Sequence, residues 1–291
     1  MRIQFIALAL LCSAHLPAFP QSDAFQSPDH VGDSYEIRLE SESHSTGDNG
    51  SGSSSSRSTL IERVLQVQAD GVELEFDLPS DTPPEQRMRE WQFPARVFKS
   101  SEGTLDLLNV TELESRLDIW LERGGVDRVH CGKWLFTWTA LQINCDPYSV
   151  LETLKMYDLR LGEIHPGRVL NDALAKAPAP LKIEVGSEAN TYVADFELDP
   201  DLLRRRLAET DVAVSEIMGP RPLSLAEAIE ARSSETISGA LRMSLEIDPE
   251  GRVIRRTRLS NTEIKQMDGS VHRTTVTETV YRQANVEQSS E

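Results

Sequence analysis

The feature that most restricts the fold of this chain is a two-residue alternation of apolar and polar side chains near both of its ends. Between residues 72 and 78 apolar residues alternate with acids without a break, and between 241 and 247 they again occupy every second position. This period is typical of a β-strand with one buried face. Residues 35–40 follow the same pattern. We therefore expect the two terminal strand groups to join in one antiparallel sheet whose other face is solvated.

Short turn signals connect these strands. Asp70–Gly71 separates two β-type runs and predicts a hairpin. Towards the C-terminus, turns at 248–251 and 268–269 predict a three-stranded antiparallel meander over residues 241–281.

Helix-start signals occupy the middle of the chain, where a capping residue is followed by an acid three positions later or by proline. Four such signals occur, at Thr111, Asp146, Asp199 and Ser224. A further short helix is expected over 168–177. The sequence thus predicts a single α+β domain over residues 32–283, in which several helices from the middle of the chain pack on one face of the sheet. A division into two domains near Pro178–Pro180 is the alternative.

One segment of this domain lacks apolar side chains. Residues 44–58 are rich in glycine and serine and cannot bury enough apolar surface to offset their ordering entropy. We predict a disordered loop there that joins two strands, and a flexible tail over residues 284–291.

The N-terminus predicts export. Arg2 precedes an apolar run over residues 3–11, which is typical of a secretory signal peptide and too short to span a bilayer. We expect a signal peptide over residues 1–24, cleaved after Ala18 or Ala24. The alternatives are a lipidated Cys12 and a buried N-terminal strand. The expected product is a soluble periplasmic or extracellular protein without a transmembrane anchor.

Cysteine usage agrees with an oxidising compartment, because removal of the leader leaves one pair, Cys131 and Cys145. A disulfide between them would close a loop of roughly 15 residues and stabilise the fold by about 3 kcal/mol. Two free buried thiols are the alternative. The pair lacks the spacing of zinc ligands, so no metal site is predicted.

Charge and motif content restrict the classes of function. The formal net charge of −17 repels phosphate backbones and argues against nucleic acid as the main partner. Neither a Gly-x-Ser-x-Gly elbow nor a His-Glu-x-x-His pattern occurs. The sequence therefore predicts no catalytic residue, metal or cofactor.

Aromatic residues give the one candidate for a binding site. Trp134, Phe136 and Trp138 lie two apart, so on a strand they share one face. With Trp120 they are predicted to form the wall of an apolar cavity between the sheet and the helices, a packed core being the alternative. A curved antiparallel sheet covered by helices is similar in outline to the folds of periplasmic lipoprotein carriers, a similarity of architecture alone.

These observations favour a non-catalytic exported protein that binds or carries an apolar ligand or an envelope partner. One alternative is a secreted hydrolase that uses carboxylates or a serine outside the known motifs. Another is a structural or assembly factor of the envelope.

Overall fold

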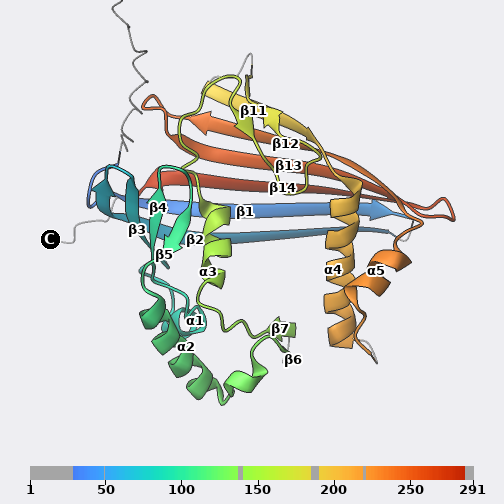
Figure 1. Ribbon diagram of the computed structural model, residues 1–291, viewed down its shortest axis with the longest axis horizontal. Helices are drawn as coiled ribbons and strands as arrows, with labels where there is room; N and C mark the ends of the chain where they lie inside the picture. Colours follow the sequence, from blue (N-terminus) through green and yellow to red (C-terminus); the bar gives the residue numbers. More distant parts are fainter. Residues whose placement is uncertain (1–28, 49, 137–139, 185–189, 219–220, 286–291) are drawn as a thin grey trace, which may run out of the picture.

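A single antiparallel sheet dominates the computed structural model, which describes residues 29–48, 50–136, 140–184, 190–218 and 221–285. Ten strands pair in the order β10-β11-β12-β13-β14-β1-β2-β3-β4-β5 (Figure 1). β1 (Ser34–Gly47) lies between β2 (Gly50–Gln68) and β14 (Val271–Ala284), so the first and last strands of the chain meet inside the sheet. This confirms the prediction that the terminal strand groups form one antiparallel sheet.

The remaining strands extend this centre in both directions. On the N-terminal side they are β3 (Gly71–Asp77), β4 (Ala95–Ser100) and β5 (Leu105–Leu107). On the other side they are β13 (Val253–Lys265), β12 (Thr236–Ile247), β11 (Asn190–Glu197) and β10 (Lys182–Ile183). Two small hairpins lie outside the sheet and consist of β6 (Trp134–Phe136) with β7 (Ala140–Gln142), and β8 (Val169–Leu170) with β9 (Ala179–Pro180).

The helices come from the middle of the chain, as predicted. They are α1 (Pro84–Arg89), α2 (Val110–Gly124), α3 (Ser149–Tyr157), α4 (Pro200–Met218) and α5 (Leu225–Ala231), with a 3-10 turn over Arg128–His130. α3 and α4 cross the same face of the sheet, whereas α1 and α2 lie below the strands in this view (Figure 1). α3 and α4 therefore cover one face of the sheet.

The predicted helix starts are right at two of the four positions. Asp199 caps α4, and Ser224 forms the capping box of α5 with Glu227. α2 instead begins after Asn109, and α3 begins three residues after Asp146. The helix predicted over 168–177 is wrong, because the backbone of this segment bonds to a neighbouring strand. Leu181 N–H donates to the carbonyl of residue 168 at 2.7 Å.

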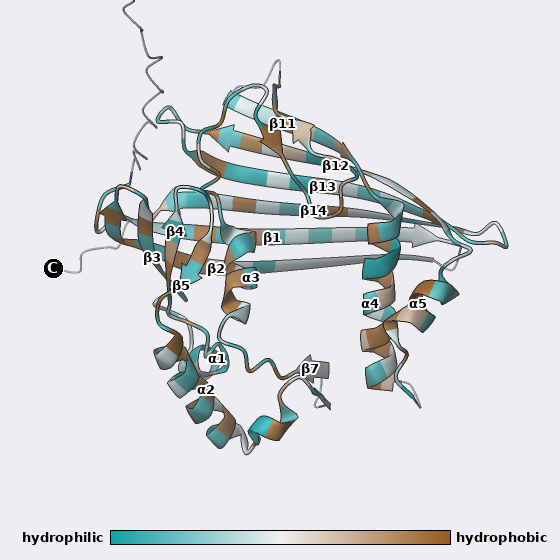
Figure 2. Cartoon of the chain, viewed as in Figure 1, coloured by the Kyte–Doolittle hydropathy of each residue, from teal (hydrophilic) through white to brown (hydrophobic). Residues whose placement is uncertain are grey.

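One hydrophobic core lies between the sheet and the helices. Its members on the sheet occupy the alternating positions that the sequence indicates, such as Leu74 on β3 and Leu245 on β12. Leu117 on α2 and Leu154 on α3 are fully buried against the same cluster. Apolar residues gather where β3, β4 and β5 meet α3 (Figure 2). Burial of this face stabilises the fold through the hydrophobic effect.

The hairpin between β2 and β3 is confirmed, with its loop one residue earlier than predicted. Gly71 pairs with Gln68, so Ala69 and Asp70 form the loop. Gly71 has a different role, since a Cβ there would lie 2.3 Å from the carbonyl oxygen of Lys99. Glycine at this position lets β4 approach β3 closely.

The prediction of a disordered loop over residues 44–58 is wrong. Its described residues form the distal part of the β1–β2 hairpin, with His44 opposite Ser53 and Ser45 opposite Gly52. β14 pairs with the other edge of β1 along the same length. The ladder therefore satisfies the backbone of the arm although its serine side chains bury little apolar surface.

Several predictions concern the ends of the chain. The predicted signal peptide, residues 1–24, and residues 286–291 of the predicted tail lie outside the described residues. β14 continues to Ala284, the first residue of that tail. None of the helices among the described residues is long and apolar enough to cross a membrane.

Candidate functional site

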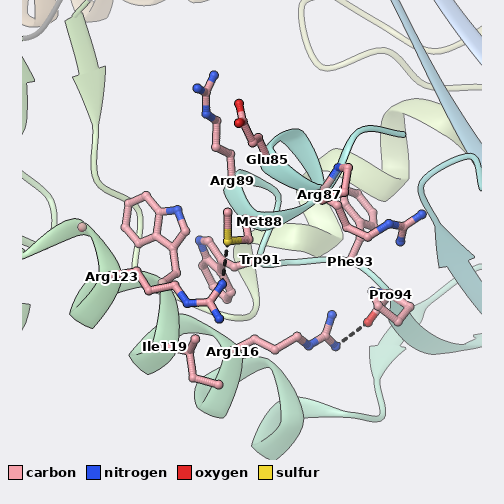
Figure 3. A pocket seen from close by; sticks show the side chains of 13 residues that line it. Glu85, Arg87, Met88, Arg89, Trp91, Phe93, Pro94, Arg116, Ile119 and Arg123 are labelled. Carbon is pink, nitrogen blue, oxygen red and sulfur yellow. Dashed lines mark hydrogen bonds between the residues drawn. The ribbon is translucent and has the colours of Figure 1, made fainter. Parts of the chain in front are cut away.

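A groove of about 790 Å³ lies between α1 and α2 (Figure 3). Its volume is within the range of small-molecule sites in proteins. Trp91, Phe93 and Pro94 come from the segment between α1 and β4 and line the groove together with the two helices. The lining is rich in aromatic and aliphatic side chains, and it also contains four arginines.

The first wall, α1, is held against the end of β3. Pro84 stands in the first turn of this helix, where a missing N–H costs nothing. The guanidinium of Arg87 donates to Asp77 Oδ1 at 2.7 Å and to the carbonyls of Leu78 and Pro79 at 3.1 and 3.0 Å. Arg87 is therefore a structural clamp whose donors are engaged before any ligand enters.

The floor is fixed by burial and by an amide side chain. Trp91 and Phe93 are buried and belong to the main core. Asn109, which precedes α2, accepts the N–H of Arg96 at 2.9 Å and donates to the carbonyl of Pro94 at 3.1 Å. These bonds tie the start of α2 to β4, so the groove is preformed.

The second wall is one face of α2. Arg116, Ile119, Trp120 and Arg123 follow the spacing i, i+3, i+4 and i+7, which places them side by side on a helix. The adjacent face carries the buried leucines that join α2 to the core. Ile119 is a large apolar residue, and it is 49% exposed. α2 thus presents an apolar stripe with an arginine at each end.

The charge of the groove is opposite to that of the protein. Among its lining residues Arg87, Arg89, Arg116 and Arg123 are cationic, and Glu85 is the one acid. The chain as a whole carries a net charge of −17. Burial lowers the pKa of Arg116 below its ordinary value, opposed by Glu112, Asp77 and Glu75. A local excess of cations in an acidic protein favours an anionic ligand.

The predicted disulfide is confirmed and lies outside the groove. Cys131 and Cys145 are joined with their Cα atoms 5.5 Å apart. The bridge connects the segment after α2 to the segment before α3 and encloses the β6–β7 hairpin.

Of the four aromatic residues predicted as a cavity wall, Trp120 and Trp134 have described side chains, and these two lie on different elements. Trp120 lines the groove, where its aromatic neighbour is Trp91. Trp134 lies on β6, and its Nε1–H donates to Glu216 Oε2 on α4 at 2.9 Å. Trp138 and the side chain of Phe136 lie outside the described residues, so an aromatic wall in that segment stays a prediction.

Sequence reasoning missed the groove, although two signals pointed to it. The first is the apolar pair at 119–120 between arginines spaced seven apart, and the second is the Trp-x-Phe-Pro run at 91–94. Neither resembles a known ligand motif. Neither signal shows that α1 lies opposite α2, and this arrangement is seen only in the fold.

A second cluster of charges is balanced and buried. Asp29 and Glu62 are 6% and 2% exposed, and each accepts hydrogen bonds from both Arg160 and Arg282. Arg282 also stacks on the ring of Tyr35, with its Cζ 3.6 Å from the centroid. Two acids facing two guanidiniums leave no net charge for a ligand, so we assign this cluster to stability.

Metal ligation has no support among the described residues, where no group of three or more histidine, cysteine, aspartate or glutamate side chains could hold an ion.

Comparisons with known proteins return no family and only distant likenesses. No protein-family model matches the sequence, and no curated protein matches it. A structure titled "Lipid-protein interactions in lipovitellin" is 10% identical, with a TM-score of 0.42 over 90% of this chain and 26% of that one. Ail, the attachment invasion locus protein of Yersinia pestis, is 6% identical, with a TM-score of 0.18 over 87% of this chain and 100% of that one. This chain thus spans about a quarter of the lipovitellin chain. Both TM-scores are too low to carry an argument.

Proposed function

We propose that this protein is an exported, non-catalytic binding protein that holds an apolar or amphipathic small molecule in the groove between α1 and α2. The observation that carries the proposal is the groove itself, preformed and lined by Trp91, Trp120 and the half-exposed Ile119. Burial of such side chains by a ligand is favourable. The Cys131–Cys145 disulfide supports residence in an oxidising compartment.

The test uses dodecanol, an uncharged molecule with one alkyl chain. We expect it to change the tryptophan emission of the protein with a saturable binding curve, because two tryptophans line the groove. Ile119→Glu should weaken this binding about tenfold or more, since it places a carboxylate in the apolar stripe.

A matched control exists on another helix. Val214 on α4 is 49% exposed, the same fraction as Ile119, and it does not line the groove. Val214→Glu should leave dodecanol binding unchanged. Equal weakening by both substitutions, or a linear emission change without saturation, would contradict a site in this groove.

A further inference from the structure

The charged side chains of the groove differ in whether the protein itself satisfies them. Both Nη groups of Arg87 are engaged, by Asp77 and by two carbonyls. Arg116 is not, because among the described residues its Nη2 donates to the carbonyl of Pro94 at 2.6 Å while Nε and Nη1 are buried without a hydrogen-bond partner. Buried donors without acceptors are rare and costly in folded proteins.

The carboxylates near Arg116 leave this need unmet. The nearest, Glu112 Oε1, lies 3.6 Å from Nη2, which already has an acceptor. Glu112 is itself half exposed, and ion pairs of that kind contribute little. What Arg116 lacks is an acceptor for Nε and an acceptor for Nη1. These two groups lie at different edges of the planar guanidinium, and each edge is completed by Nη2. The edge formed by two N–H groups of a guanidinium matches the two oxygens of a carboxylate.

The surroundings define the rest of the ligand. Arg116 lies at one end of the apolar stripe, and Ile119 follows it along the helix (Figure 3). Trp120 is the next residue of the stripe. At the other end Arg123 has a weak acceptor, the Met88 sulfur, 2.5 Å from its Nη1. Seven residues of helix separate the two arginines by about 10 Å. An alkyl chain that starts at Arg116 can therefore lie over the stripe.

We propose that the groove selects long-chain carboxylic acids, with the carboxylate bound by the guanidinium of Arg116 and the alkyl chain over Ile119 and Trp120. This inference rests on the proposed function and deepens it by naming the class of ligand. The carboxylate supplies an acceptor to Arg116 after a small rotation of the guanidinium towards the groove. The local excess of arginine over glutamate supports the same anionic ligand.

The experiment compares dodecanoate with dodecanol, which share a chain length and differ in the head group. We expect dodecanoate to bind at least about tenfold more tightly, because hydrogen bonds to a charged group are stronger than neutral ones. Arg116→Met should remove this preference, so that the affinities for dodecanoate and dodecanol become similar. Arg116→Lys keeps the positive charge but lacks the paired N–H groups of a guanidinium, so it should retain part of the preference.

Arg123→Met is the matched control, since it removes the same charge from the same helix face. It should keep most of the preference for dodecanoate. Thermal unfolding of each variant shows whether it is folded, and Arg116→Lys carries the test if Arg116→Met is not.

Each other result has a defined meaning. Equal affinity of wild type for acid and alcohol would overturn this inference and leave the proposed function standing. Equal loss of the preference in Arg116→Met and Arg123→Met would overturn the role of Arg116. The preference for dodecanoate would then come from the overall positive charge of the groove. Absence of saturable binding by either molecule would overturn the proposed function as well.

Discussion

Asp29 shows how a single carboxylate can hold distant parts of this chain together. Its two oxygens accept hydrogen bonds from Arg160, before the β8–β9 hairpin, and from Arg282 on β14. Burial alone would raise the pKa of Asp29, but the two arginines outweigh it and hold the pKa below its ordinary value of 3.8. Burial, with the nearby Asp29 and Asp33 and against Arg282, raises the pKa of Tyr35 to about 12. The phenol therefore stays protonated and donates to Asp29.

We expect Asp29→Asn to lower the free energy of unfolding by about 3 kcal/mol, because it leaves two buried guanidiniums opposite one carboxylate. Urea denaturation at neutral pH measures this loss. Asp118→Asn is the control, since Asp118 pairs with Arg128 at 2.7 Å but is 63% exposed. Exposed pairs of that kind contribute between 0 and about 1 kcal/mol. A similar loss in both variants would contradict a special role for the buried cluster.

The same residue gives a pH dependence with a defined sign. Because the pKa of Asp29 is lower in the folded state, its contribution to stability is complete above its ordinary pKa of 3.8 and disappears as the pH falls below that value. The stability difference between wild type and Asp29→Asn should therefore shrink on acidification below about pH 4. A difference that is constant over this range would contradict the assignment.

At the scale of elements, the long β1–β2 arm contains two kinds of strand in one ladder. The half of β2 from Leu60 to Val64 is buried in the core, whereas residues 50–58 have exposed side chains. Both halves pair with β1 residue by residue. The ladder is thus continuous, but only one half is covered by apolar packing.

We expect this difference to appear in hydrogen exchange. Local opening of the serine half breaks backbone bonds without exposing a core, so its amides should exchange at least about tenfold faster than those of residues 60–64. Exchange followed by mass spectrometry on peptides from the two halves measures the ratio. Equal protection in both halves would mean that the arm opens only with the whole domain.

The arm also shows what the sequence could and could not predict. The strands at 72–78 and 241–247 were predictable because the burial of one face leaves a two-residue period in the chain itself. The serine run carries no such period. It pairs with β1, whose other edge is paired with β14, more than 200 residues away in sequence. Its pairing is decided by neighbours, which propensity cannot describe.

The groove was unpredictable for a related reason. α1 is six residues long and buries none of its side chains, so its sequence has no periodic pattern of apolar residues that would predict a helix. The face of α2 that lines the groove has helical spacing in the sequence. That spacing alone does not show which element lies opposite this face. By contrast, the disulfide was predictable from counting, since only two cysteines follow the expected leader.

At the scale of the molecule, the path of the chain ties its two ends together. β1 and β14 are neighbours over twelve residue pairs, from Tyr35 with Ala284 to Thr46 with Arg273. β14 also supplies Val280 to the core and Arg282 to the buried charge cluster. The N-terminal strands therefore depend on the C-terminal one for hydrogen bonds, packing and charge balance. The single domain predicted over residues 32–283 stays a prediction.

We expect removal of residues 271–291 to unfold the N-terminal half of the chain as well as the C-terminal half. The truncation exposes an edge of both β1 and β13 and leaves Asp29 and Glu62 with one arginine instead of two. Near-ultraviolet circular dichroism, which includes signals from Trp91 and Trp120 in the N-terminal half, should lose its native bands. Removal of residues 286–291 alone is the control and should leave the spectrum intact, because it spares β14. A native spectrum from a fragment that ends near Pro178 would instead support two domains. Such a fragment lacks β14 entirely, so it could fold only if the N-terminal strands stabilise one another.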